Sequence, residues 1–290
     1  MYGNFKDGQF FCEECFYNLY FWCNNCEKIF SIEDRCIADN GWYYCPDCFD
    51  EVNLLHDYDY KPEAIIFHND NDENNNNLHV GIELEIQGKN HCSFIKKAKE
   101  KFDETIFYFK HDGSLDDTGV EIVSQPMSYN FIKHTDYWYD LFNLMFEYGM
   151  DDVDNAGLHF HLDKNYFSES EIAVIDYIVN NFSHSFYQCG GRIFNSNSRY
   201  CRTVYKNLED WGKNTNKDNR YQAVNLTNQH TIELRFCEST YEFDVFKERV
   251  KLIYAIAQFA KQYTLKDIYN WNEYTFINHF NKIILDMFVY

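Results

Sequence analysis

Three short segments, far apart in the chain, carry charged or imidazole side chains at every second position. They are Gly-Ile-Glu-Leu-Glu at 81–85, Gly-Leu-His-Phe-His at 157–161 and Thr-Ile-Glu-Leu-Arg at 231–235. This spacing puts the polar side chains on one face of a β-strand and the apolar ones on the other. Burying such charges together is costly unless they meet a cation or a charged ligand. The pattern therefore predicts a metal and phosphate site on one face of a β-sheet.

Composition limits the partners of the chain. Its 290 residues are 45% hydrophobic and 19% aromatic, which is enough for a globular core in one large domain or two smaller ones. The 46 acidic residues exceed the 26 basic ones, and a net charge of -20 argues against binding to nucleic acid. The chain has no apolar run of about 18 residues and no secretory signal after Met1, so we expect a cytoplasmic protein with no membrane partner.

Cysteines are concentrated at the N-terminal end, where seven of the eleven precede residue 50. Cys23 and Cys26 form one Cys-x2-Cys pair, and after eighteen residues Cys45 and Cys48 form another. Two tight turns at this spacing can present four thiolates tetrahedrally to Zn²⁺. In a reducing compartment, a metal site is favoured over a disulfide framework. We therefore predict a structural zinc module over residues 1–55.

A further pair, Cys12 and Cys15, lies in a segment (10–16) that repeats the pattern of segment 43–49. It looks like the second half of an earlier copy of the module whose first Cys-x2-Cys is missing. The arrangement resembles the LIM-like and treble-clef families of tandem zinc modules. Cys12 and Cys15 could recruit Cys36 or His56, could share a metal with a partner's ligands, or could hold no metal. The acidic residues around them favour a protein partner over DNA.

A polar stretch predicts a linker over 56–77, followed by a second domain over 78–290. Alternating patterns predict strands at 80–86, 106–109, 119–124, 156–162, 220–225 and 230–237. Helical spacing predicts helices at 92–102, 129–148, 168–186, 243–263 and 271–290. The irregular order of these elements favours an α+β fold with a mainly antiparallel sheet and flanking helices. Neither GxxxxGK[ST] nor GxGxxG occurs, so a nucleotide would need a different binding device.

Five motifs of the second domain occur in the order seen in amidoligases. They are Gly81-x-Glu83-x-Glu85, the Asp112-Gly113-Ser114 turn with Glu121-Ile122-Val123-Ser124, Gly157-Leu158-His159-x-His161, Arg220-Tyr221-x-x-x-Asn225 and Thr231-x-Glu233-x-Arg235-Phe236. Over residues 78–265 the chain thus resembles the carboxylate-amine ligase superfamily, which includes glutamine synthetase and glutamate-cysteine ligase. The resemblance implies a curved antiparallel sheet whose concave face holds ATP and two or more Mg²⁺ or Mn²⁺ ions. It also implies amide formation through an acyl phosphate.

Under this resemblance, individual residues acquire expected roles. The carboxylates suit Mg²⁺, and His159 is the expected imidazole ligand, which gives a catalytic and metal-binding set of Glu83, Glu85, Glu121, His159 and Glu233. Arg235 is expected at the γ-phosphoryl group, since guanidinium groups bind phosphate in a bidentate manner. For ATP and the acid substrate we expect Asp112, Ser114, His161, Arg192, Arg220 and Asn225, with Arg199 as a further candidate.

The sequence thus predicts an ATP-dependent ligase that joins a carboxylic acid to an amine, on an amino acid, a peptide or a related substrate. Two other functions fit parts of the pattern. A metal-dependent hydrolase could use the same histidines and glutamates, although HExxH is absent. A non-catalytic adaptor could combine the zinc module with a degenerate ligase scaffold.

Overall fold

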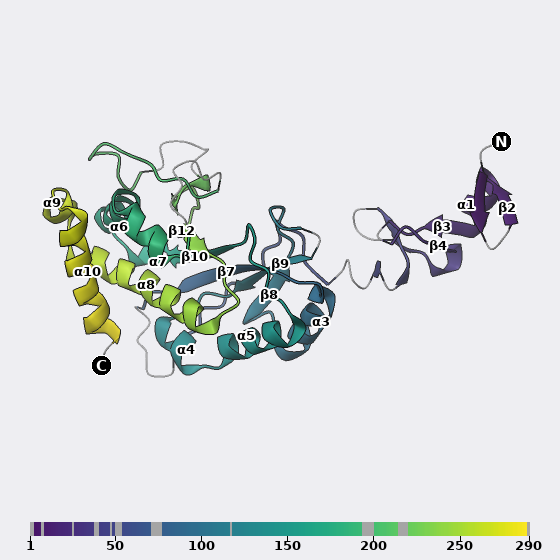
Figure 1. Ribbon diagram of the computed structural model, residues 1–290, viewed down its shortest axis with the longest axis horizontal. Helices are drawn as coiled ribbons and strands as arrows, with labels where there is room; N and C mark the ends of the chain where they lie inside the picture. The colour runs from purple at the N-terminus through teal and green to yellow at the C-terminus, as the bar shows by residue number, and fades with distance from the viewer. Residues whose placement is uncertain are drawn as a thin grey trace. The chain divides into compact units, whose positions relative to one another are not determined.

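The computed structural model describes residues 3–6, 9–24, 26–37, 41–46, 48, 49, 54–70, 77–116, 118–192, 200–213 and 220–288. The chain forms two compact units, Met1–Asp57 and Tyr58–Tyr290 (Figure 1). The boundary lies near the end of the predicted zinc module. Each unit has its own hydrophobic core.

The first unit is built from short hairpins and one short helix. Strands β1 (Gly3–Lys6) and β2 (Gln9–Cys12) pair and lead into α1 (Glu13–Leu19). Strands β3 (Tyr20–Trp22) and β4 (Ile29–Ser31) follow, then the 3-10 helix η1 (Ile32–Asp34) and the pair β5 (Cys36–Ile37) and β6 (Tyr43–Tyr44). One small core joins Phe21 and Tyr44 to three buried cysteines. A core of this size is too small to stabilise a fold without a further cross-link.

A six-stranded sheet forms the centre of the second unit. Its order is β11 (Val224–Asn225), β12 (Thr231–Glu238), β10 (Gly157–Asp163), β7 (Val80–Gln87), β9 (Gly119–Ser124) and β8 (Phe107–Lys110). Each neighbouring pair is antiparallel. The α+β class with an antiparallel sheet is therefore confirmed.

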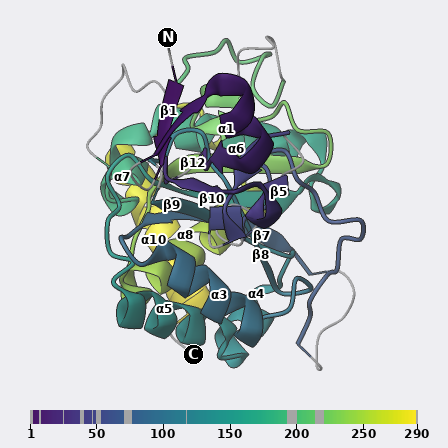
Figure 2. The same cartoon turned by 90° about the vertical axis from the view of Figure 1, so that its right-hand side faces the viewer.

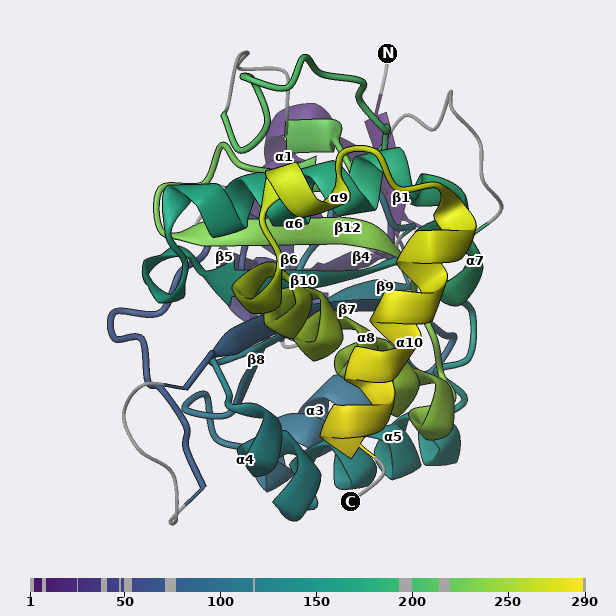
Figure 3. The same cartoon turned by 90° about the vertical axis from the view of Figure 1, so that its left-hand side faces the viewer.

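One face of this sheet is apolar and covered by helices. Val80, Ile82, Leu84 and Ile86 of β7 are completely buried. Trp138 of α5 (Tyr137–Tyr148) contacts Phe107 of the sheet and Phe246 of α8 (Phe243–Gln262), with ring centroids 4.8 and 4.4 Å away. Figures 2 and 3 show α5 together with α3 (His91–Lys101) and α4 (Tyr129–His134) along the same side of the strands. α10 (Glu273–Phe288) packs against α8 (Figure 3).

Two predicted helices are each divided in the structure. The helix expected over 129–148 becomes α4 and α5, because Thr135 has extended backbone angles and its hydroxyl donates to the Phe131 carbonyl at 2.7 Å. The helix expected over 168–186 becomes α6 (Glu169–Asn181) and α7 (Ser183–Cys189). Phe182, at the break, stacks on Phe276 of α10 with centroids 4.2 Å apart. A capping box formed by Ser168 and Glu171 begins α6. After α8, the short α9 (Leu265–Ile268) precedes α10.

Much of the predicted linker belongs to the second unit. Tyr60 packs edge-on against Tyr108 of β8, with ring centroids 5.7 Å apart. His68 forms a backbone bridge to Met127, and its Nε2 lies 2.5 Å from the Thr105 carbonyl oxygen. Residues 58–70 are therefore part of the folded domain rather than a linker, while residues 71–76 lie outside the described residues. Aromatic side chains such as Tyr60 pack residues 58–70 against the sheet of the second unit.

Candidate functional site

The second face of the sheet collects the charged side chains of the sequence motifs. The antiparallel register places His159 opposite Glu83, and His161 opposite Gly81 on one side and Glu233 on the other. Glu121 lies opposite Glu85 and, on its other side, opposite Lys110. Side chains of directly paired residues lie on the same face. Segments up to 150 positions apart in the sequence, such as those of Glu83 and Glu233, therefore meet at one site.

Glu83, His161 and Glu233 form the first cluster. One ligand atom from each lies within 4.8 Å of the others. Nε2 of His161 lies 3.2 Å from Glu83 Oε2, yet it is buried and forms no hydrogen bond with the described part of the chain. The other ring nitrogen, Nδ1, lies 3.3 Å from the Thr231 hydroxyl, a contact that orients the ring. A buried imidazole nitrogen without a hydrogen bond, next to two carboxylates, fits a metal ligand.

Glu85, Asp112 and Glu121 form the second cluster, again with one ligand atom each within 4.8 Å of the others. The backbone N–H of Gly157 donates to Glu85 Oε2 at 2.5 Å. Nζ of Lys110 lies 2.9 Å from Glu121 Oε2. The donor set of this cluster is entirely carboxylate oxygen, the type that Mg²⁺ and Mn²⁺ prefer.

Crowding changes the protonation of these acids. Burial raises the pKa of Glu83, but the neighbouring His161 and His159 more than offset this, and the pKa lies well below its usual value. Burial, together with repulsion from Glu83, raises the pKa of Glu121 to about 9. Burial also raises the pKa of Glu85. Carboxylates held this close favour either a proton or a cation between them.

The raised pKa of Glu121 predicts a pH-dependent stability in metal-free protein. An acid whose pKa rises on folding from 4.5 to about 9 stabilises the fold fully below the lower value and loses this contribution as the pH approaches the upper one. Between pH 6 and 9 we expect wild type to lose up to about 1.4 kcal/mol of unfolding free energy per pH unit more than Glu121→Gln. Urea unfolding with a chelator present measures this difference. Equal slopes for the two proteins would show that Glu121 is ionised throughout.

The two histidines differ in their relation to the two clusters. His159, the predicted metal ligand, belongs to neither cluster, and its Nδ1 lies 3.5 Å from Glu83 Oε2 and 3.6 Å from Glu85 Oε1, between the two. His161, predicted at ATP or an oxyanion, belongs to the first cluster. The regular pairing of β10 with β12 places His161 opposite Glu233, whereas the register is irregular between Leu158 and Phe160, where His159 lies.

Arg235 and Asn225 hold Glu233 in place. The Arg235 guanidinium forms an ion pair with Glu233 Oε1, and its Nε donates to the Tyr200 carbonyl at 3.2 Å. Asn225 donates its side-chain amide to Glu233 Oε2 at 2.6 Å. Asn228 does the same at 3.2 Å, and the sequence analysis did not identify it. Lys110 was also missed, although its alternation with Tyr108 in the strand pattern was a usable signal.

The remaining predicted residues differ in their proximity to the clusters. Asp112 is a member of the second cluster, and Ser114 donates its backbone N–H to Asp112 at 2.6 Å. Arg192 reaches the space beside Gly157 and His159. The Arg220 guanidinium instead lies over the Tyr221 ring, 4.6 Å from its centroid, and no ion pair with a described cluster residue is present. Arg199 lies outside the described residues.

An open pocket of about 540 Å³ lies at the Asp163 end of β10. Its lining combines two aromatic rings, three carboxamides, an imidazole and a carboxylate, from Phe67, Tyr166, Asn69, Asn77, Asn165, His79 and Asp163. Asp163 follows His161 by two positions on β10, so both residues belong to the same face of the sheet. The sequence analysis did not predict this cavity, because its lining comes from loops that flank the strands.

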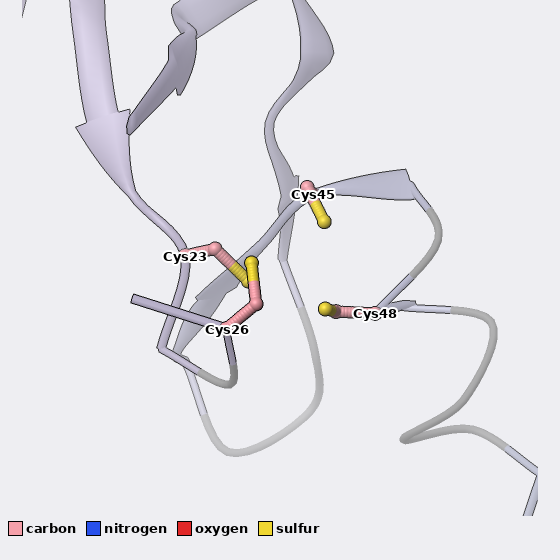
Figure 4. Close-up of side chains that lie close together, drawn as sticks. All are labelled: Cys23, Cys26, Cys45 and Cys48. Carbon is pink, nitrogen blue, oxygen red and sulfur yellow. The ribbon is translucent and has the colours of Figure 1, made fainter. Parts of the chain in front are cut away.

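In the first unit, the side chains of Cys23, Cys26, Cys45 and Cys48 point toward one another (Figure 4). Their sulfur atoms all lie within 4.8 Å of each other. Burial raises the pKa of the Cys45 thiol, so ionising it here requires a compensating positive charge. This cluster is compatible with zinc, as predicted.

Cys12 and Cys15 are not part of the four-cysteine cluster. Both are exposed, and the Cys15 N–H donates to Cys12 Sγ at 3.3 Å. No third ligand joins them among the described residues.

Neither a family model nor a curated protein matches this sequence. Within the described parts of the chain, no helix combines the length and hydropathy needed to cross a bilayer. The likeness to amidoligases therefore rests on the sequence motifs alone.

Proposed function

We propose that this chain is an ATP-dependent ligase that joins a carboxylic acid to an amine. One observation carries the proposal: two clusters of metal-ligand type lie side by side on one sheet face, linked through Glu83 and Glu85 of β7. Paired divalent-cation sites of this kind are typical of enzymes that transfer phosphoryl groups. The order of the five motifs adds the specific likeness to carboxylate-amine ligases.

Glu83, His161 and Glu233 would hold one Mg²⁺ or Mn²⁺, and Glu85, Asp112 and Glu121 would hold a second. When bound, such ions neutralise phosphate charge and align the nucleophile with the leaving group. Thr231, Gly157 and Asn225 hold the ligand side chains in their orientations through the contacts described above. The protein thus supplies a rigid set of donors rather than a flexible one.

Arg235 is suited to the γ-phosphoryl group. Its guanidinium is fixed by Glu233 and by the Tyr200 carbonyl, which leaves other N–H donors for a ligand. A fixed guanidinium stabilises the negative charge that develops on the transferred phosphoryl oxygens. Lys110, beside Glu121, adds a second cation at the other cluster.

In the proposed reaction, an oxygen of the substrate carboxylate attacks the γ-phosphorus of ATP, and the bond from that phosphorus to the oxygen of ADP breaks. The products of this step are an acyl phosphate and ADP. The amine then attacks the carbonyl carbon, gives up a proton as the C–N bond forms, and expels inorganic phosphate. That phosphate retains the oxygen that began on the acid. Water must be kept from the acyl phosphate because hydrolysis would waste it.

The pocket at the Asp163 end of β10 is suited to the nucleoside of ATP. Phe67 and Tyr166 offer aromatic surfaces for a base, and the carboxamides offer donors and acceptors for its edges. Asp163, which lines the pocket, is two positions from His161 on β10, so the phosphates of a nucleotide bound there would extend toward the clusters. This provides a binding device that needs no glycine-rich loop.

Phe67→Ala is expected to weaken ATP binding about tenfold, since stacking of one base on an aromatic ring contributes roughly 1–3 kcal/mol. Ile65→Ala is the matched control, because Ile65 is exposed in the same segment and does not line the cavity. Fluorescence titration with an ATP analogue measures the dissociation constant of each variant. Equal ATP affinities for the two variants would show that the nucleoside does not bind in this pocket.

Transfer of ¹⁸O distinguishes the proposed reaction from a hydrolase. With ¹⁸O-labelled carboxylic acids, MgATP and an amine, inorganic phosphate should gain one ¹⁸O for each amide formed. A hydrolase would leave phosphate unlabelled and would form no amide. Mass spectrometry of the phosphate gives the result.

We also propose that the first unit contacts protein rather than nucleic acid. Trp22, Ile37 and Trp42 are exposed apolar side chains on this unit. Glu13 and Glu14, in the first turn of α1, would repel a phosphate backbone.

A further inference from the structure

The loop between β11 and β12, residues 226–230, determines how Glu233 is held. Asn225, just before the loop, and Asn228, within it, donate their side-chain amides to the same oxygen of Glu233, at 2.6 and 3.2 Å. The side-chain oxygen of Asn225 in turn accepts the backbone N–H and the hydroxyl of Thr227, at 2.9 and 2.7 Å. The orientation of the buried Glu233 carboxylate therefore depends on the conformation of this loop.

Lys164 contacts the β11–β12 loop from the end of the neighbouring strand. It is the first residue of the 3-10 helix η2 (Lys164–Tyr166), which follows β10 directly. Its backbone N–H donates to the His230 carbonyl at 2.9 Å. Its ammonium group donates to the Leu226 carbonyl at 3.0 Å and also to the Asn228 carbonyl. One lysine thus joins three carbonyls of a five-residue loop.

The ammonium of Lys164 has no carboxylate partner among the described residues, and its hydrogen bonds are to backbone carbonyls. Burial lowers the pKa of this group. Partial burial of a cation without an anionic partner costs free energy, which its hydrogen bonds to the carbonyls offset. A lysine in this environment is suited to fixing the loop rather than to forming a surface ion pair.

We infer that Lys164 is a positioning residue for Glu233, which it holds in place for a divalent cation through the β11–β12 loop. This role rests on the proposed function, because that function places a cation at the first cluster. Partners that orient a metal ligand raise its affinity for the metal, and their loss typically weakens binding about 10- to 100-fold. Lys164 acts one contact further out, through the loop that carries such a partner, Asn228.

Titration of the zinc-loaded protein with Mn²⁺ alone tests this role, with the free ion followed by electron paramagnetic resonance. Wild type should bind two Mn²⁺, and Glu233→Gln identifies which dissociation constant belongs to the first cluster. Lys164→Met should raise that constant about tenfold and leave the other unchanged. Methionine keeps most of the apolar stem but removes the N–H donors. An unfolded variant would lose both ions, so retained binding at the second cluster shows that the fold is intact.

Lys164→Arg should recover part of the Mn²⁺ affinity, because a guanidinium also donates to carbonyl oxygens. Lys261→Met is the matched control. The Lys261 ammonium also donates to a backbone carbonyl of η2, that of Tyr166 at 2.5 Å, but its other hydrogen bond is to Glu171 rather than to the loop. This variant should bind both Mn²⁺ ions like wild type.

A double-mutant cycle shows whether Lys164 acts through the loop. Asn228→Ala removes one of the two amides that hold Glu233. Because both residues would act on the same carboxylate through the same loop, the double variant should lose less affinity than the product of the two single effects. Strictly multiplicative effects would contradict a shared route.

Equal Mn²⁺ dissociation constants for Lys164→Met and wild type would overturn the role of Lys164. Equal weakening at both clusters would do so as well, because it indicates a general loss of structure. A tenfold effect of Lys261→Met would assign the cause to η2 as a whole and would also overturn it.

Mn²⁺ binding requires no turnover, so its outcome is separable from that of the proposed reaction. A chain whose first Mn²⁺ site is weakened by Lys164→Met, but which never forms ADP, contradicts the ligase and supports the role of Lys164. A chain that forms ADP and amide, and whose Mn²⁺ affinity Lys164→Met leaves unchanged, supports the ligase and contradicts that role. A wild-type chain that binds no Mn²⁺ contradicts both.

Discussion

Replacement of Glu83 by Gln is expected to lower ADP formation from MgATP on the order of a thousandfold. Glu83 belongs to the first cluster, and its Oε2 lies within 3.5 Å of ring nitrogens of both His161 and His159. Gln keeps the shape of the side chain but removes its charge, so the affinity for a divalent cation falls and the transferred phosphoryl group loses its compensating charge. A coupled assay for ADP measures the effect directly.

Glu100→Gln is the matched control for this experiment. Glu100 lies on α3 with 67% of its side chain exposed and forms only a surface ion pair with Lys97. Such pairs contribute about 0–1 kcal/mol, so this variant should turn over like wild type. Circular dichroism verifies that both variants are folded. If Glu83→Gln turned over at the wild-type rate, the assignment of Glu83 as a metal ligand would be wrong.

Removal of zinc is expected to unfold Met1–Asp57 while the sheet of the second unit stays intact. The buried core around the cluster contains Phe21, Tyr44 and three of its cysteines, so we expect most of the stability of the first unit to come from the metal. Zinc binding to four thiolates supplies on the order of 10 kcal/mol. Limited proteolysis after treatment with a chelator should cleave this region and spare residues of the six-stranded sheet.

Cys45→Ser should reproduce the effect of the chelator, whereas Cys189→Ser should not, because Cys189 is exposed and outside the cluster. Metal analysis should find one zinc ion per chain, and replacing both Cys12 and Cys15 by Ser should leave that number unchanged. Unaltered circular dichroism and protease resistance after chelation would contradict a structural zinc at this site.

The strands were predictable because polar and apolar residues alternate along them in the sequence. Glu83 and Glu85 alternate with completely buried apolar residues, so both the strand β7 and its polar face followed from the pattern. The four-cysteine cluster followed equally well from spacing. In both cases the relevant geometry is local, and neighbouring residues determine it.

The roles of the two histidines could not be predicted in the same way. His159 and His161 have the same local pattern, and the pairing of β10 with its two neighbours, β7 and β12, distinguishes them. The irregularity beside Leu158 depends on packing between strands that lie more than 70 residues apart. The cavity beside Asp163 and the break at Phe182 likewise depend on distant partners, Phe67 and Phe276.

ADP release from MgATP tests the central claim most directly. The assay uses pooled acids that include diacids and acidic amino acids, with and without pooled amines. The proposed function predicts that wild type releases ADP only when both an acid and an amine are present, with amide formed in equal amount. ADP release that does not depend on the amine would contradict a carboxylate-amine ligase. So would the absence of ADP release together with the absence of MgATP binding.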